Sequence, residues 1–308
     1  MRIRVLGSAA GGGFPQWNCG CSNCRAARDG STRVRPRSQE SVAVSADGIS
    51  WFLLNASPEI RAQIESFPPL HPRGLRHSPV EGVVLTNGDL DHTLGLLSLR
   101  ESHPVVVYAT EPVRNGFVEQ NVLYSTLQRF PGQVTWRSLP LGVEVELTTA
   151  GEVSGLSIQA FAVPGKLPVH LERLPSPAGG SEAANIGLRI RDRARSRVLA
   201  YVPAAGKLTA EVMAALEGAD CLFFDGTFWS SDELVAQGLG DKRAEDMAHL
   251  PIGGERGSLA QLAAVRAPVR VYIHINNTNP ILREDSAERA AVERGGFQVA
   301  HDGLEVLL

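Results

Sequence analysis

Three of the four cysteines of this chain lie within six residues, at Cys19, Cys21 and Cys24. Cysteines this close pair poorly with one another, and a chain of 308 residues does not need a disulfide framework. Thiolates on one tight loop can instead supply three corners of a tetrahedral zinc site. We therefore expect a structural zinc ion at these side chains, the alternative being three thiols that bind no metal.

The fourth ligand of such a site has to come from a distant part of the chain. His274 follows an apolar run, and Asn277 lies three residues further on. Three thiolates and one imidazole form a common closed zinc site, whereas asparagine is a poor ligand. The sequence leaves two possibilities open. Either His274 closes the cysteine site, or Asn277 or water does so and His274 is free for chemistry.

A second cluster follows the apolar run Gly82–Thr86 and contains Asp89, Asp91 and His92. Carboxylate and imidazole donors suit Fe(II), Mn or Zn. Asp91 and His92 begin a predicted helix, where the helix dipole favours a carboxylate. The alternative is that these acids only cap a helix or form a turn. We interpret the adjacent Asp-His pair as part of a metal or catalytic site.

Two more residues have the chemistry of a site. Asp225 comes directly after an apolar run, so it either faces a site or is buried and paired. His249, on a Gly-rich loop, could act as a general acid or base. The candidate catalytic residues are Asp89, Asp91, His92, Asp225, His249 and His274, and the candidate metal ligands are Cys19, Cys21, Cys24, His274, Asp91 and His92.

Short β-rich and helical runs alternate along the whole chain and must position these residues. Asp47-Gly48 is a strong hairpin turn signal between two apolar runs, and Ser57 with Pro58 is typical of a helix start. The predicted strands are Arg2–Gly7, Ser41–Ala46, Ser50–Asn55, Gly82–Thr86, Asn185–Ile190, Arg197–Val202, Cys221–Phe224 and Val269–Ile273, with helices from Ser57 and over Thr209–Leu216.

Both halves of the chain, about 1–150 and 151–308, have the order hairpin, helix, apolar strand, acidic loop. This order predicts a single α/β domain, a pseudo-duplicated four-layer αββα sandwich with the sheets inside. In such folds polar groups collect at the carboxyl ends of the strands, where the candidate residues stand. Leu167–Ala184, rich in Pro, Gly and Ser, is either a lid over the site or a disordered insertion.

Composition restricts the class of protein further. Hydrophobic residues make up 43% and charged residues 20% of the chain, which is ordinary globular usage and enough for a sizeable core. The formal net charge of −3 gives no indication of nucleic-acid binding. No run approaches the roughly 18 apolar residues of a membrane span, and the first residues lack the apolar core of a signal peptide. We expect a cytoplasmic protein.

The segment Thr86–His92 (TNGDLDH) resembles the THxHxDH motif of the metallo-β-lactamase superfamily. Asn87 and Asp89 stand where that motif has its first two histidines, while Asp91 and His92 match. The region that usually carries a third histidine, near Val163–Gly165, has none unless His170 folds back. Closer similarity to one branch of the superfamily extends over the runs GSAAGGGFPQWNCGCSNC, TNGDLDHTLGLLSLRE, FFDGTFW, HLPIGG and YIHINNTNPIL.

This resemblance implies an αββα sandwich with its site at the mouth between the sheets. It also implies a role in making pyrroloquinoline quinone (PQQ), a redox cofactor built from a glutamate and a tyrosine of a precursor peptide. The expected partners are that precursor, as a peptide or a small molecule derived from it, and other proteins of the pathway. Proteins of this branch are also described as carriers of the cofactor or a precursor toward the periplasm.

The departures from the superfamily motif favour a different chemistry from two-metal hydrolysis. Asp91, His92 and His274 form the donor set of non-haem Fe(II) oxygenases, with Asp89 nearby. Our hypothesis is that Fe(II) binds there and that the protein hydroxylates the tyrosine-derived ring of the precursor. Two alternatives remain. The protein is a carrier of PQQ or a precursor, which would use the loop cations Lys166, Arg173, Lys242 and Arg243, or it is a degenerate metallo-hydrolase acting on the precursor peptide.

Overall fold

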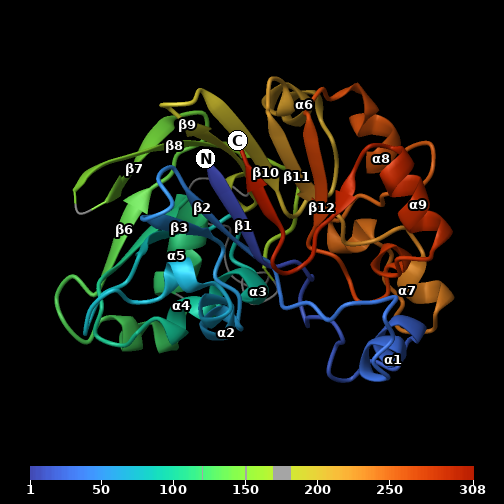
Figure 1. The fold of residues 1–308 in the computed structure, drawn as a ribbon, viewed down its shortest axis with the longest axis horizontal. Coiled ribbons are helices and arrows are strands. Elements are labelled where there is room, and N and C mark those ends of the chain that lie inside the picture. Colours follow the sequence, from blue (N-terminus) through green and yellow to red (C-terminus); the bar gives the residue numbers. More distant parts are fainter. Residues whose placement is uncertain (120, 150, 169–181) are drawn as a thin grey trace.

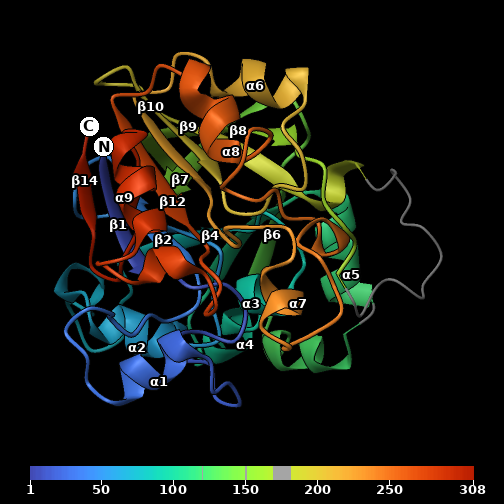
Figure 2. The same ribbon diagram turned by 90° about the vertical axis from the view of Figure 1, so that its right-hand side faces the viewer.

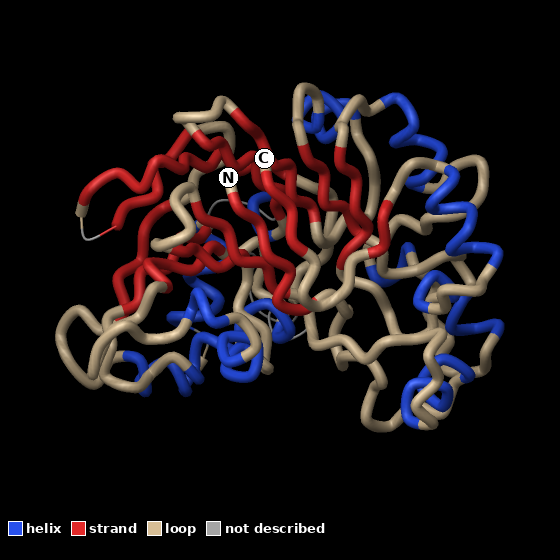
Figure 3. Tube along the Cα trace, viewed as in Figure 1, coloured by secondary structure: helices blue, strands red, loops and turns tan. Residues whose placement is uncertain are grey.

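The computed structural model describes residues 1–119, 121–149, 151–168 and 182–308, which form two seven-stranded sheets packed against each other (Figure 1). Figure 3 shows the strands gathered in the middle of the molecule. The first sheet contains, in order, β14 (Glu305–Leu307), β1 (Arg2–Gly7), β2 (Ser41–Ser45), β3 (Trp51–Leu54), β4 (Val80–Val84), β5 (Val105–Ala109) and β6 (Val134–Ser138). The second contains β13 (Gln298–Val299), β12 (Val269–Ile273), β11 (Cys221–Asp225), β10 (Arg197–Val202), β9 (Ile186–Asp192), β8 (Glu152–Ala162) and β7 (Glu144–Thr149).

Helices cover the outer face of each sheet. Those packed on the first sheet include α2, α4 and α5, and those on the second include α6, α8 and α9, which Figure 2 views from outside. The helices are α1 (Ser22–Arg28), α2 (Ile60–Glu65), α3 (Leu90–Thr93), α4 (Gly95–Ser98), α5 (Glu111–Glu119), α6 (Ala210–Leu216), α7 (Glu233–Ala236), α8 (Ser258–Gln261) and α9 (Ala287–Arg294). Short 3₁₀ helices span Pro68–Leu70, Val122–Leu127, Glu182–Ala184, Glu245–Met247, Leu262–Ala264 and Pro280–Leu282.

The hydrophobic core is divided into three layers by the two sheets. The central layer lies between the sheets and contains Phe52 and Leu54 from the first and Tyr201 and Phe223 from the second. The two outer layers lie between each sheet and its helices. Burial of apolar side chains on both faces of each sheet is the main source of stability for this architecture. The predicted αββα sandwich is therefore confirmed.

Both sheets begin with antiparallel strands and continue with parallel ones. In the first sheet β1, β2 and β3 are antiparallel and β3 to β6 are parallel, and in the second β7 to β10 are antiparallel and β10 to β13 are parallel. On this matching order we propose that the chain consists of two similar halves. Two strands cross the predicted boundary at about residue 150, because β7 precedes it in the second sheet and β14 returns to the first.

The predicted strands correspond to β1, β2, β3, β4, β9, β10, β11 and β12 with shifts of at most a few residues. The helix predicted from Ser57 is wrong in its start, because α2 begins at Ile60 with Glu59 at its N-cap. The Ser57 hydroxyl donates instead to Gln63 Oε1 at 2.9 Å, so it does not cap the helix. Of the predicted loop Leu167–Ala184, residues 169–181 lie outside the described part of the chain, so its role as a lid or insertion stays a prediction. No helix among the described residues is long and apolar enough to cross a bilayer.

Candidate active site

The candidate residues converge at one edge of the sandwich because the strands that precede them end there. Asp91 and His92 lie on α3, just after β4. Asp225 is the last residue of β11, and His274 directly follows β12, its neighbour in the second sheet. His249 joins them from a loop, and a cavity of about 210 Å³ lies over the group. Parallel strands bring their carboxyl ends to one edge, as expected for a site in an α/β fold.

Asp91, His92 and His274 form the centre of this site. His274 Nε2 lies 3.1 Å from Asp91 Oδ2, and His92 Nε2 lies 3.8 Å from the same oxygen. The two imidazole rings meet edge to face with their centroids 5.2 Å apart. Two ring nitrogens and one carboxylate oxygen therefore face a common point, within 4.8 Å of one another.

The far nitrogen of each imidazole is turned toward a threonine. Thr227 Oγ1 lies 2.8 Å from His274 Nδ1, and Thr86 Oγ1 lies 3.4 Å from His92 Nδ1. Partners of this kind fix the ring orientation of metal-binding histidines. His92 Nε2 is buried without any hydrogen-bond partner, although such atoms are normally satisfied. An orphaned ring nitrogen aimed at a carboxylate and a second imidazole fits a bound metal ion.

The electrostatics of the site also favour a cation. Burial lowers the pKa of His92 to about 4. Burial would lower the pKa of His274 as well, but its hydrogen bond to Asp91 and the charges of Asp91 and Asp225 raise it to about 9. Burial would raise the pKa of Asp91, yet the two imidazoles hold it well below its usual range. The carboxylates of Asp91 and Asp225 thus favour a positive charge at the imidazole of His274, which a divalent metal would replace.

Asp225 supports its neighbours. Its Oδ2 accepts hydrogen bonds from the Ala205 backbone N–H at 2.9 Å and from His249 Nδ1 at 2.7 Å. Its Oδ1 accepts from the backbone N–H and the hydroxyl of Thr227, at 3.0 Å and 2.5 Å. A carboxylate with both oxygens engaged in this way is a poor bridging ligand. It holds His249 by Nδ1, which leaves Nε2 of that ring for the cavity.

The residues at the first two histidine positions of the superfamily motif have other roles. The Asn87 side chain donates to Asn185 Oδ1 at 3.3 Å and accepts from the Asp89 backbone N–H at 3.0 Å. Asp89 lines the cavity, and burial together with the nearby charge of Asp91 raises its pKa to about 6. Asn87 is thus occupied within the fold. His170, the other residue considered for this half of the site, lies outside the described residues.

Sequence reasoning missed Glu40, a fully buried carboxylate at the bottom of the site. Its Oε2 accepts from Asn55 Nδ2 at 2.8 Å and lies 3.6 Å from His92 Nε2, and its Oε1 accepts from the Tyr201 hydroxyl. Burial raises the pKa of Glu40 to about 8. A signal was present, because Glu40 immediately precedes β2, whose amino end lies at the same edge as the carboxyl end of β4.

The cysteine cluster lies apart from these residues, in the loop before α1 and the first turn of that helix. Its three ligand atoms lie within 4.8 Å of one another, as zinc requires. The Asn277 side-chain nitrogen lies 3.1, 3.7 and 3.4 Å from the sulfurs of Cys19, Cys21 and Cys24. A half-turn of the amide would place its oxygen there instead. The amide of Asn277 thus faces the sulfurs, whereas His274 lies with Asp91.

The thiols interact with one another as neighbours of a metal site do. Hydrogen bonds from Cys21, Cys24 and Asn277 lower the pKa of Cys19 in spite of its partial burial. Burial, together with the neighbouring Cys21 sulfur, raises the pKa of Cys24 to about 11. Closely packed sulfurs resist sharing negative charge, and a bound zinc ion relieves this repulsion.

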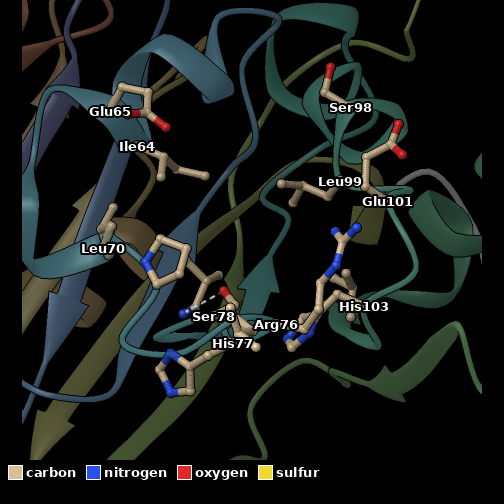
Figure 4. A pocket seen from close by; sticks show the side chains of 14 residues that line it. Ile64, Glu65, Leu70, Arg76, His77, Ser78, Ser98, Leu99, Glu101 and His103 are labelled. Carbon is tan, nitrogen blue, oxygen red and sulfur yellow. Dashed lines mark hydrogen bonds between the residues drawn. The ribbon is translucent and has the colours of Figure 1, made fainter.

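The lysines and arginines that the sequence predicted near the site do not all lie there. Lys166 lines the cavity of the candidate site, whereas Lys242 and Arg243 do not, and Arg173 lies outside the described residues. A larger cavity of about 300 Å³ opens at the other end of β4 and β5, lined by Leu70, Leu99, His103 and others (Figure 4). It lies at the start of these strands, away from the Asp-His cluster, and its lining is mostly apolar.

Comparison with known proteins agrees with the fold. The family model of the beta-lactamase superfamily domain matches residues 50–275. A diphosphatase of the PhnP family has the same fold, with a TM-score of 0.67 and 21% identity over the whole of this chain and 97% of that structure. The family-model match, together with the fold, places the chain in the beta-lactamase superfamily.

Relatives with higher sequence identity show which family of this superfamily the chain belongs to. Coenzyme PQQ synthesis protein B of Methylorubrum extorquens strain PA1 is 47% identical over 99% of each chain, and that of Rhizobium meliloti is 46% identical over the whole of this chain and 98% of the relative. The crystal structure of Zn²⁺-bound PqqB from Methylobacterium extorquens superposes with a TM-score of 0.92, at 46% identity over both complete chains. The chain belongs to the coenzyme PQQ synthesis protein B family.

Proposed function

We propose that this protein acts in PQQ synthesis and that it hydroxylates the tyrosine-derived ring of a precursor made from glutamate and tyrosine. Family membership supports the pathway, since the relatives are named for the synthesis of this coenzyme. The single observation that carries the reaction is the Asp91, His92 and His274 donor set with its orphaned His92 nitrogen. Two histidines and one carboxylate with open positions are typical of non-haem Fe(II) oxygenases.

When bound, Fe(II) would supply the activation of dioxygen, so that one oxygen atom would enter an aromatic C–H bond as a hydroxyl group and the other would leave as water, with two electrons and two protons from an external two-electron reductant and solvent. The protein binds and orients the ring in the cavity above the triad. Asp225 holds His249 at Nδ1, so Nε2 of this ring is free to face the cavity. There His249 Nε2 takes up the phenolic proton of the substrate ring.

The cysteine cluster has a structural role in this proposal. Three thiolates with the Asn277 amide as the fourth group would hold zinc, and this closed set leaves no position for substrate. A zinc-bound relative of 46% identity supports the metal, although not its position in this chain. Four free cysteines fit a reducing compartment, so we place the reaction in the cytoplasm.

The test is metal analysis joined to turnover. Protein purified without oxygen is loaded with Fe(II), and zinc and iron are counted per chain before oxygen uptake is followed with a Glu–Tyr-derived substrate. One zinc, one iron and substrate-dependent hydroxylation are expected. His92→Ala and His274→Ala should lose iron and turnover, while the matched control His103→Ala, in the other cavity, should keep both.

Other outcomes would replace the proposal. A protein that takes up zinc alone and binds PQQ without turnover is a carrier. Two zinc ions and cleavage of the precursor peptide indicate a hydrolase. Full hydroxylation by His92→Ala would contradict the assignment of the triad.

A further inference from the structure

The cavity over the candidate site is lined by carboxylates, imidazoles and one lysine. Asp89 and Asp91 face it together with His92, His249 and His274, and Asp225 lies behind it. Among the described residues that line it, Lys166 is the only lysine or arginine. An anionic ligand entering such a cavity is repelled by the carboxylates unless a fixed cation receives it.

Lys166 is placed by contacts on both sides of it in the chain. The Pro164 carbonyl accepts a hydrogen bond from the Gly206 backbone N–H at 2.7 Å. Gly165 packs so closely on Asn185 that a Cβ there would come within 2.6 Å of its side chain. Beyond the lysine, Pro168 lies against Gly88, where an added Cβ would meet it at 3.0 Å. The backbone around Lys166 is therefore pinned to the edge of the site.

Asn185 ties this segment to the rest of the site. Its Nδ2 donates to the carbonyls of Val163 at 3.2 Å and Ala204 at 3.0 Å, and its Oδ1 accepts from Asn87. Asn87 and the segment near Val163 are the regions where the superfamily motif expects metal-binding histidines. In this chain one buried amide joins the two regions, and the next polar side chain along the segment is Lys166.

We propose that Lys166 is a specificity residue that binds a carboxylate of the ligand. This inference takes only the identity of the ligand from the proposed function. A Glu–Tyr-derived precursor and PQQ itself both carry carboxylates, so Lys166 has the same role with either ligand. Lys166 lines the same cavity as Asp91, His92 and His274, so its charge acts on a ligand that lies over them. A carboxylate held by Lys166 would leave the remainder of the ligand over Asp91 and His92.

The test compares ligands with and without carboxylates on one metal-loaded protein. Binding of the Glu–Tyr dipeptide and of its analogue without carboxylates, Gln–Tyr amide, is measured by calorimetry without oxygen, and binding of PQQ is measured in parallel. We expect the wild type to prefer the acid over the amide by about tenfold, the magnitude of a charge-assisted hydrogen bond. Lys166→Gln should lose this preference, and Lys166→Arg should keep most of it.

Lys242→Gln removes the same charge from an exposed loop and should change nothing. Metal content serves as a second readout, because Lys166→Gln should bind as much metal as the wild type. PQQ binding that depends on Lys166, without binding of the dipeptide, would sustain this inference while the oxidative function fails. An unchanged preference in Lys166→Gln, or a wild type that binds neither anion, overturns it.

Discussion

The cysteine cluster and the Asp-His cluster are built in opposite ways. Three groups of the first lie within six residues, and only Asn277 comes from far along the chain. In the second, Asp91 and His274 are separated by 183 positions. One cluster is therefore a property of a local motif, and the other exists only when both sheets have formed. Local sulfur chemistry suits a closed structural site, and distant oxygen and nitrogen donors suit an open one.

The two clusters share one segment of chain, from His274 to Asn279. His274 faces the Asp-His cluster, and Asn277 faces the sulfurs. Asn23, beside the cysteines, donates to the carbonyls of Asn277 and Asn279 at 3.2 and 3.0 Å. The cysteine loop thus holds the segment that carries His274, a proposed metal ligand. This coupling predicts how far a change at one cluster affects the other.

The largest effect is expected for His92→Ala, which removes the orphaned ring nitrogen. Affinity for the second metal should fall by more than about 100-fold, because a ligand is lost and its neighbours remain charged. Zinc at the cysteines should remain at one per chain. Metal content after dialysis measures both. Loss of the two metals together would mean that the clusters form one cooperative unit.

Cys24→Ser should mainly cost stability. Loss of a thiolate releases the proposed zinc, and its binding free energy is part of the folding free energy. For a chain of this size we expect Tm to fall by roughly 5–10 °C. Affinity for the second metal should fall only a few-fold, since Thr227 still orients His274. Scanning calorimetry with zinc analysis checks this, and an unchanged Tm with zinc retained would contradict it.

Glu233→Gln probes the support beneath the shared segment. Glu233 is buried, and it accepts hydrogen bonds from the Thr278 hydroxyl and from the Trp229 backbone N–H at 2.7 Å. Burial raises the pKa of Glu233 to about 7. The folded state therefore holds this proton more tightly than the unfolded chain. The wild type should lose up to about 3 kcal/mol of unfolding free energy as the pH rises from about 4.5 through about 7.

The variant should show a flatter dependence of Tm on pH between 5 and 8. The exposed Glu255→Gln is the matched control and should follow the wild type. Parallel curves for Glu233→Gln and the wild type would show that this carboxylate does not take up a proton on folding.

The smallest effect is expected at Asn277. Asn277→Asp provides a stronger oxygen donor and should slow zinc release to a chelator a few-fold, while Asn277→Ala should speed it. A chelator competition assay measures both rates. Equal rates for Asn277→Ala and the wild type would mean that water, rather than the amide, completes the cysteine site.

Much of the fold could be predicted from the sequence, because apolar runs and turn signals are local. The hairpin around Asp47-Gly48 forms as predicted, with β2 and β3 antiparallel, and the order of strands gave the αββα class. Helix boundaries depend also on whether a polar side chain caps the helix or bonds elsewhere in the fold. Ser57 resembles an N-cap, yet its hydroxyl has a better partner in Gln63, and the helix begins later.

The parts of the site that the sequence did not reveal depend on contacts between distant segments. Glu40 immediately precedes β2, and its place at the site depends on the pairing of β2 with β3. The sequence also could not decide between His274 and Asn277 at the sulfurs, since both follow β12 within a few residues. The turn of the backbone after that strand sends them to different clusters.

That turn has an evolutionary consequence. His274 has a φ of +58°, a left-handed conformation that glycine and asparagine adopt with less strain than histidine. If the proposed reaction were lost, exchange of this histidine would relieve the strain. At residue 274 the preference of the backbone therefore opposes the proposed use of the imidazole. Family members that carry glycine or asparagine at this position are expected to lack the proposed metal site.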